Sequence, residues 1–298
     1  MYREIIVGHD LHDGGDDALA LGRLLAAPSG AHLVVAGVFP TGIVPRGFEA
    51  RWREEEERVA GEIQSIADEA AAEAEAFPSG SPARGLHDLA EERDSDLIVV
   101  GSSRHSELGQ ILAGNVGLGL LHGSPCAVAL APRGYRDHAP RELGALTVGV
   151  DGSDESGLAL RAAISLAEAS GAGLRLVAVA VPPPVLRGGR GAGRGPGYEA
   201  LKDAIEDQMR EQLSAAAASI PDEVSATATL VSGDPAERLV EAAADGGILI
   251  LGSRAYGPVR RVLLGSVSSA LVRSAPCPLL VHPRGARGPD DQTARHAG

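Results

Sequence analysis

Residues 248–283 read ILILGSRAYGPVRRVLLGSVSSALVRSAPCPLLVHP, and this stretch decides the fold. Its first four residues are apolar and partly β-branched, as in a strand that is buried on both faces of a sheet. Val267, Ala270 and Leu271 follow at the spacing of one apolar helical face, and Pro276 ends the helix that they predict. The Leu-Leu-Val segment near the end predicts a second buried strand. The stretch therefore reads as strand, loop, helix and strand.

Two features of this stretch indicate chemistry. Gly252 follows the first strand at its carboxyl end, which is where ligands bind in open α/β sheets. Gly265 and Ser266 lie at the start of the helix, where free N–H groups, the helix dipole and a hydroxyl form an anion site. Together they predict a phosphate-binding loop. The alternative is structural, a tight-turn glycine followed by a serine cap, and the spacing alone favours neither.

The same pattern occurs a second time, in residues 97–132, LIVVGSSRHSELGQILAGNVGLGLLHGSPCAVALAP. Gly101 matches Gly252 and Gly114 matches Gly265, with one constant offset of 151 residues (252 − 101 and 265 − 114). This period is far too long for a solenoid repeat. It predicts two copies of a whole domain.

Composition bounds the class of protein. A chain of 298 residues suggests two domains at roughly 150 residues each. Aromatic residues make up 3% of the chain and hydrophobic residues 44%, so the core is expected to consist of Ala, Val, Leu and Ile. The net charge of −13 argues against nucleic acid or an anionic membrane as a partner.

Cysteine usage and hydropathy indicate where the protein works. Cys126 and Cys277 occupy matching places between a helix and a strand, which favours two buried thiols over a disulfide. The sequence shows no signal-peptide pattern and no apolar run of roughly 18 residues, so we expect a soluble, cytoplasmic protein.

Strand and helix patterns alternate along the first half. Asp10 follows the first strand at its carboxyl end, and residues 77–84 read as a short connection in which a degenerate sequence leaves room for a third strand. Residues 39–47 read as a loop and 133–144 as a linker. Strands are expected over residues 4–8, 32–38, 97–100 and 127–131, and helices over 18–27, 51–76 and 85–92.

The second half repeats the alternation. A net insertion of ten residues is placed in the Pro- and Gly-rich segment 182–197, which we expect to be mobile, and residues 284–298 read as a disordered tail. The predicted fold class is α/β, with two tandem domains over 1–135 and 145–283, each a five-stranded, mainly parallel sheet with helices on both faces. The second-half strands are expected over 145–150, 174–181, 223–231, 248–251 and 279–281, and the helices over 158–169, 198–220 and 236–244.

At this point the motifs resemble those of a known family. VGVDGSDES at residues 148–156, SGDPAERLVEAA at 232–243 and LGSRAYGPVRRVLLGSVSSALVRSAPCPLLV at 251–281 are similar to motifs of universal stress proteins. The likeness covers about residues 3–283, so the chain looks like a tandem universal stress protein. The resemblance implies Rossmann-like domains of the adenine nucleotide alpha hydrolase-like kind.

The resemblance also implies a nucleotide site in each half. The ATP-binding branch of the family carries Gly-x2-Gly-x9-Gly-Ser/Thr. By this likeness the second half would bind ATP through Asp151 at the adenosine, Val179 at the adenine edge, Gly252 at the ribose and phosphates, and Gly265, Ser266 and Val267 at the phosphate oxygens, beside the loop residues Arg254 and Ala255. The first-half counterparts are Asp10, Val38, Gly101, Arg104, Gly114, Asn115 and Val116.

Both halves depart from that motif, and the first departs further. The second glycine is replaced by Ala255 in one half and by Arg104 in the other, while the Ser/Thr is retained as Ser266 but becomes Asn115. Alanine adds one methyl group, whereas arginine either reaches a phosphate or fills the pocket with its stem. We therefore expect nucleotide in the second half before the first.

Metal binding and further phosphate contacts have weaker support in the sequence. His9, His12 and four aspartates within residues 10–17 suggest a metal cluster, but an acidic first helical turn explains them better. Magnesium is expected only as an ion carried by ATP. Arg260 and Arg261 read as a solvated loop face.

Three functions remain open. The first is an ATP-binding regulatory protein of the stress response, the second a slow ATPase with the same pocket, and the third a dimerising scaffold without nucleotide. The sequence shows no catalytic base, so no catalytic residue is predicted. Family resemblance further implies that the two halves pair as a pseudo-dimer through antiparallel strands 127–131 and 279–281, and a homodimer of the whole chain stays open.

Overall fold

The computed structural model describes residues 1–40, 49–183, 196–245, 247–253 and 265–283. Within this part of the chain, each half runs β-α-β-α-β-α-β-α-β, as the sequence predicts. The elements of the first half are β1 (Glu4–Gly8), α1 (Asp13–Ala26), β2 (His32–Pro40), α2 (Glu49–Ala70), β3 (Glu73–Ser79), α3 (Pro82–Glu92), β4 (Leu97–Gly101), α4 (Asn115–Leu121) and β5 (Ala127–Ala131).

A short 3-10 helix, η1 (Tyr135–Asp137), lies in the linker between the halves. The second half then repeats the order of the first. Its elements are β6 (Leu146–Val150), α5 (Asp154–Ser170), β7 (Leu174–Ala180), α6 (Pro196–Ala218), β8 (Ala226–Ser232), α7 (Pro235–Ala242), β9 (Ile248–Ser253), α8 (Ser266–Leu271) and β10 (Leu279–Pro283).

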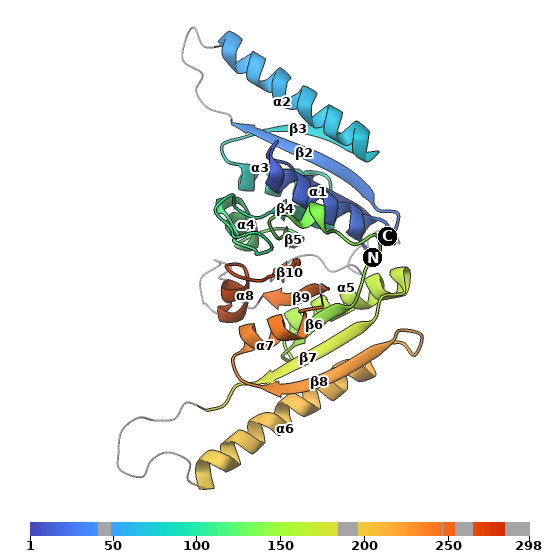
Figure 1. Ribbon diagram of the computed structural model, residues 1–298, viewed down its shortest axis with the longest axis vertical. Helices are drawn as coiled ribbons and strands as arrows, with labels where there is room; N and C mark the ends of the chain where they lie inside the picture. Colours follow the sequence, from blue (N-terminus) through green and yellow to red (C-terminus); the bar gives the residue numbers. More distant parts are fainter. Residues whose placement is uncertain (41–48, 184–195, 246, 254–264, 284–298) are drawn as a thin grey trace, which may run out of the picture.

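The strands form a single ten-stranded sheet in the order β3-β2-β1-β4-β5-β10-β9-β6-β7-β8 (Figure 1). Within each half neighbouring strands are parallel, and the order reverses between β1 and β4 and again between β6 and β9. Such switch points are where open α/β sheets bind ligands. The α/β fold class predicted from the sequence is therefore confirmed.

The two halves join along β5 and β10, which pair antiparallel with Leu280 opposite Ala129. The sequence reading named these two segments as the pairing edges, and the register confirms it. Because each half contributes its last strand, the seam closes one edge of each five-stranded sheet and leaves β3 and β8 at the ends of the joined sheet.

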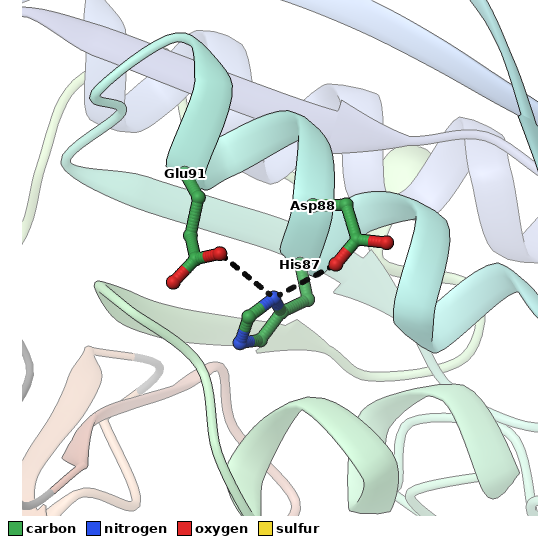
Figure 2. Close-up of side chains that lie close together, drawn as sticks. All are labelled: His87, Asp88 and Glu91. Carbon is green, nitrogen blue, oxygen red and sulfur yellow. Dashed lines mark ion pairs between the residues drawn. The ribbon is translucent and has the colours of Figure 1, made fainter.

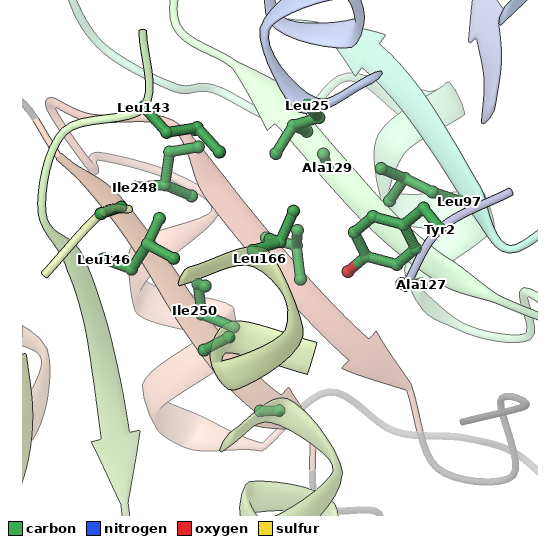
Figure 3. Close-up of a cluster of buried hydrophobic side chains, with 14 of the residues drawn as sticks. Tyr2, Leu25, Leu97, Ala127, Ala129, Leu143, Leu146, Leu166, Ile248 and Ile250 are labelled. Atoms are coloured by element: carbon green, nitrogen blue, oxygen red, sulfur yellow. The ribbon is translucent and has the colours of Figure 1, made fainter. Parts of the chain in front are cut away.

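Helices cover both faces of the sheet, since the strands are apolar on both sides. In β1, Ile5 and Val7 enter one core cluster while Ile6 enters the other. Helices α1 and α5 pack on the first face, where side chains of both halves share one core (Figure 3). Helices α3, α4, α7 and α8 pack on the second face. These two clusters therefore cross the seam, while a third, between α2 and β2, lies within the first half.

One predicted helix was too long. The sequence reading extended a helix over residues 51–76, whereas α2 ends at Ala70 and β3 begins at Glu73. Alternating Glu and Ala residues have good helix propensity, but parallel pairing with β2 overrides it. Ala71, with φ of 53°, breaks the helix. The third strand allowed for within residues 77–84 does reach Ser79, but it begins earlier, at Glu73.

Several element ends also differ. Helices α1 and α5 begin at Asp13 and Asp154, earlier than predicted, because their acidic first turns lack the apolar period but suit the helix dipole. Helix α8 ends at Leu271, before Pro276. The segments expected to be mobile or disordered, 182–197 for the most part and 284–298 entirely, lie outside the described residues.

Cys126 and Cys277 are free and buried, as predicted. Burial raises the pKa of the Cys126 thiol to about 12 and that of Cys277 to about 11. Among the helices that the structure describes, none combines the length and apolar character that crossing a membrane requires.

Candidate functional site

A cavity of about 460 Å³ opens at the carboxyl ends of β1, β2 and β4 in the first half. It lies at the point where the strand order reverses, so the topology alone places a hollow there. All seven first-half residues that the resemblance singled out line it, namely Asp10, Val38, Gly101, Arg104, Gly114, Asn115 and Val116.

Gly101 is required by helix packing. A Cβ built on Gly101 would lie 2.0 Å from the carbonyl oxygen of Gly14, at the start of α1. Gly252 occupies the same position in the second half, and its Cβ would lie 2.3 Å from the carbonyl carbon of Glu155 in α5. These glycines let the helix backbone approach the strand end. The sequence reading gave them a role in approaching the ligand, and it missed this structural one.

Gly114 plays a different part at the start of α4. It is the N-cap residue, with φ of −70° and ψ of −175°, and has no side chain to cap the helix. The first amides of a helix lack an intrahelical acceptor, so those of Asn115 and Val116 are donors at the cavity wall. Among the residues that the structure describes, a Cβ on Gly114 would meet only Ser103, at 3.6 Å, which is ordinary van der Waals contact. Its backbone therefore does not require glycine.

Asp10 and Arg104 lie at the mouth of the cavity. One carboxylate oxygen of Asp10 accepts hydrogen bonds from the main-chain N–H groups of His12 at 3.1 Å and Gly15 at 3.0 Å, which fixes the turn into α1. The other carboxylate oxygen is 3.9 Å from the guanidinium of Arg104. The Arg104 side chain is 65% exposed, so its stem does not fill the pocket and its charged end is accessible.

His9 lines the same cavity and was not singled out for the nucleotide site from the sequence. Its ring is buried between Leu11, whose N–H donates to Nδ1 at 3.0 Å, and Asp16, whose carboxylate is 3.2 Å from Nε2. With Nδ1 as acceptor, Nε2 carries the proton and donates to Asp16. His9 directly follows β1, and that position is the signal that could have identified it.

The second-half candidates occupy matching positions where the structure describes them. Asp151 binds the N–H of Ser153 at 3.0 Å, and Val179 lies near the end of β7. Gly265 is the N-cap of α8, which Ser266 and Val267 begin. Arg254 and Ala255, together with Arg260 and Arg261, lie outside the described residues.

Comparison with known proteins decides the family. The profile of the universal stress protein family matches residues 1–132 and 144–283. The chain belongs to this family.

Relatives and solved structures agree with the assignment. A universal stress protein of Mycobacterium tuberculosis is 32% identical over 214 residues, which cover 68% of this chain and 69% of the relative. One of Mycolicibacterium smegmatis is 30% identical over 207 residues, covering 67% and 65%. The crystal structure of a universal stress protein from Archaeoglobus fulgidus superposes with a TM-score of 0.65 and 23% identity, covering 95% and 98%. The likeness to that structure shows the shared fold.

In this universal stress protein the acidic first turn of α1 binds the linker. The buried carboxylate of Asp17 accepts the N–H groups of Gly134 at 2.7 Å and Arg136 at 3.0 Å. The Arg136 guanidinium pairs with Asp13 at 2.8 Å and with Asp16. These aspartates, which the sequence reading weighed as metal ligands, each have a defined protein partner.

A second group with metal-ligand chemistry lies on α3 (Figure 2). The Nδ1 atom of His87 is 3.3 Å from the Asp88 carboxylate and 3.9 Å from that of Glu91. Asp88 also pairs with Arg84 at 3.3 Å, so a cation already neutralises it. This arrangement is an ion-pair network along one partly exposed helix face.

Proposed function

We propose that this chain is an adenine-nucleotide-binding universal stress protein with a regulatory role in the stress response. The single observation that supports it best is the first-half cavity, which gathers all seven residues predicted from the sequence. Residues spread from position 10 to position 116 meet there because the parallel strands end at one edge.

The walls of the cavity differ in chemistry from one side to the other. Ala36, Val38, Leu86 and Val100 supply apolar surface suited to a base. The start of α4 supplies main-chain amides suited to phosphate oxygens, with Arg104 beside them. We infer that a nucleotide binds with its base toward Val38 and its phosphates toward Asn115 and Val116. Any magnesium arrives with the phosphates.

The second half carries the same proposal on its motif. Gly265 caps α8 as Gly114 caps α4, and Ser266 retains the hydroxyl that the first half replaces with Asn115. We propose a second adenine-nucleotide site there, formed by Asp151, Val179 and the start of α8. We also propose that the chain divides into domains over residues 1–135 and 145–283. A homodimer of the whole chain is a further proposal, which light scattering tests.

Calorimetric titration of the nucleotide-free full chain with ATP tests the proposed function. We expect saturable binding that Gly114→Val weakens at least about tenfold, because its branched side chain projects beside Ser103 at the phosphate end. Gly114→Ala is the matched control for folding, since one methyl fits in ordinary contact. Gly265→Val reports on the second half in the same way.

The outcomes separate the three functions. Absence of heat with ATP, AMP and cyclic AMP would contradict nucleotide binding and favour the scaffold. Binding with phosphate release would identify a slow ATPase. Full affinity in the Gly114→Val, Gly265→Val double variant would place the nucleotide elsewhere.

A further inference from the structure

Residues 110–113 lie between the first-half cavity and the second half of the chain. The N–H of Ile111 donates to the carbonyl oxygen of Ala275 at 2.7 Å, and the N–H of Ala113 donates to that of Val272 at 2.7 Å. Both acceptors belong to the segment that follows α8. The loop of one half is therefore tied to the other half by main-chain hydrogen bonds.

Side-chain burial reinforces this tie. Ile111 is 0% exposed and Ala113 6%, and they share a core cluster with Val272 and Ala275. Removal of the apolar Ile111 surface from water stabilises this contact. The contact is therefore an extended part of the seam that adds to the pairing of β5 with β10.

The other side of the segment faces the cavity loop. The carbonyl oxygen of Leu112 accepts the N–H of Ser103 at 2.8 Å, and Ser103 lines the cavity. Gly114, the cap of α4, follows directly. Ile111 and Ala113 thus form main-chain hydrogen bonds with the second half, whereas Leu112, which lies between them, bonds to the cavity loop.

The remainder of the loop is tied to the linker. The N–H of Gly109 donates to the carbonyl of Arg133 at 2.8 Å, and the N–H of Arg133 donates to that of Gln110 at 3.1 Å. The Arg133 guanidinium donates to the carbonyl of Ser106 at 2.8 Å. The linker end and the seam end of the loop are therefore both fixed, and the seam end is adjacent to the helix start.

We propose that the second half shapes the first-half cavity, with Ile111 and Ala113 as positioning residues that hold Ser103 and the start of α4 in place. Neither residue lines the cavity, so both act through the loop. A ligand in the cavity and an intact seam then stabilise each other, since coupling free energies are reciprocal. The ligand part of this inference rests on the proposed function, and the positioning part does not.

Hydrogen exchange of the Ser103 amide in the full chain tests the positioning part without any ligand. In Ile111→Ala we expect its exchange to accelerate at least about tenfold relative to the amides of β1, with a smaller increase in Ile111→Val. Ile63→Ala is the matched control, because Ile63 on α2 is equally buried but packs in a core cluster built from first-half residues. Unchanged Ser103 exchange in both Ile111 variants would overturn the proposal.

Titration of the same variants with ATP tests the ligand part. We expect Ile111→Ala to lose about fivefold or more in affinity for the first-half site while Ile63→Ala keeps the wild-type value. Equal affinities in wild type and Ile111→Ala, with faster Ser103 exchange, would overturn the coupling. If the wild type binds no nucleotide, the proposed function fails, while the exchange result still decides whether the second half holds the loop.

Discussion

The turn after the first strand has the same shape in both halves although its residues differ. In the second half Gly152 has φ of 73°, where glycine is unstrained. In the first half Leu11 occupies the matching position and still has φ of 59°. An aspartate precedes the turn in each case and binds its amides. The main-chain conformation of this turn is therefore the same in both halves although the side chains differ.

At the loop glycines, by contrast, the residue itself is the same in both halves. Gly101 and Gly252 pack against helix backbone at matching positions in both halves. The positions that differ, Arg104 against Ala255 and Asn115 against Ser266, follow the glycines in the loop and at the helix start. Departure from the nucleotide motif therefore changes side chains at the cavity of the first half while the main-chain framework stays.

The largest expected effect is at the glycines that both halves retain. Gly101→Ala places a methyl group 2.0 Å from the Gly14 carbonyl oxygen, and Gly252→Ala makes a similar overlap with Glu155. Because the obstacle is main chain, α1 or α5 must shift, and we expect each variant to lose about 3 kcal/mol or more of unfolding free energy. Urea denaturation measures the loss. Two variants of wild-type stability would contradict the shared role.

A second effect distinguishes the halves at the seam. The buried ring of His282 is 3.4 Å from the Tyr2 hydroxyl, whereas the matching residues are Ala131 and Leu143. Burial, with the charge of Arg161, lowers the His282 pKa from 6.5 to about 4. The folded chain keeps this ring neutral while the unfolded chain protonates it. The contribution of the neutral His282 ring to the free energy of unfolding is therefore present above pH 6.5 and is lost as the pH falls toward 4.

We expect this group to remove roughly 3 kcal/mol of stability between pH 7 and pH 4. Urea midpoints of wild type and His282→Leu across that range isolate it from the carboxylates, which titrate in both proteins. The variant should show the shallower decline. Parallel pH profiles would mean that the histidine is protonated in the folded state.

The turn itself gives a smaller effect. Gly152→Ala imposes φ of 73° on a residue with a Cβ and places that Cβ 2.4 Å from the Gln212 side chain, which must move aside. We expect the free energy of unfolding to fall by about 1–2 kcal/mol. Gly157→Ala is the matched control, since that glycine lies inside α5 and its Cβ would meet only Arg161 at 3.6 Å. The control should gain up to about 1 kcal/mol. Thermal unfolding distinguishes the expected loss from the expected gain. A neutral Gly152→Ala would show that this turn accepts a side chain at positive φ without strain, as Leu11 would then do in the first half.

The smallest effect concerns Arg104, a loop side chain by which the first half differs from the second. Arg104→Ala makes the first half match Ala255 of the second. Because Arg104 is 65% exposed, we expect only about fivefold weaker ATP binding, or about 1 kcal/mol, with a reduced dependence on salt. Titration at two salt concentrations measures both. Tighter binding in the variant would show that the guanidinium obstructs the cavity.

Most of the fold could be predicted from the sequence because the chain repeats itself. Strands such as β4 and β9 are continuous apolar runs, and the repeat established their equivalence. The family resemblance indicated the two strands that pair at the seam. The position of β3 could not be predicted, since Glu73 and Glu75 owe their place to Arg93 and to pairing with β2. These contacts belong to the tertiary structure and leave no pattern in the local sequence.

The candidate site divides in the same way. Residues at strand ends and at the helix start, such as Asp10 and Gly114, follow from motif spacing and all reach one cavity. The hydrogen bonds of the His9 ring and the contacts of Ile111 with the second half could not be predicted, because they depend on how a turn folds back and on how the halves meet. Long-range main-chain bonds leave no local pattern.

The central claim is that the amides at the start of α4 bind nucleotide phosphate, and amide NMR of the labelled full chain during ATP titration tests it most directly. We predict saturable shifts of Asn115 and Val116, together with Ser103, that disappear in Gly114→Val and persist in Gly114→Ala. Saturable binding that leaves those three amides unmoved, with shifts gathered elsewhere on the chain, would contradict the account.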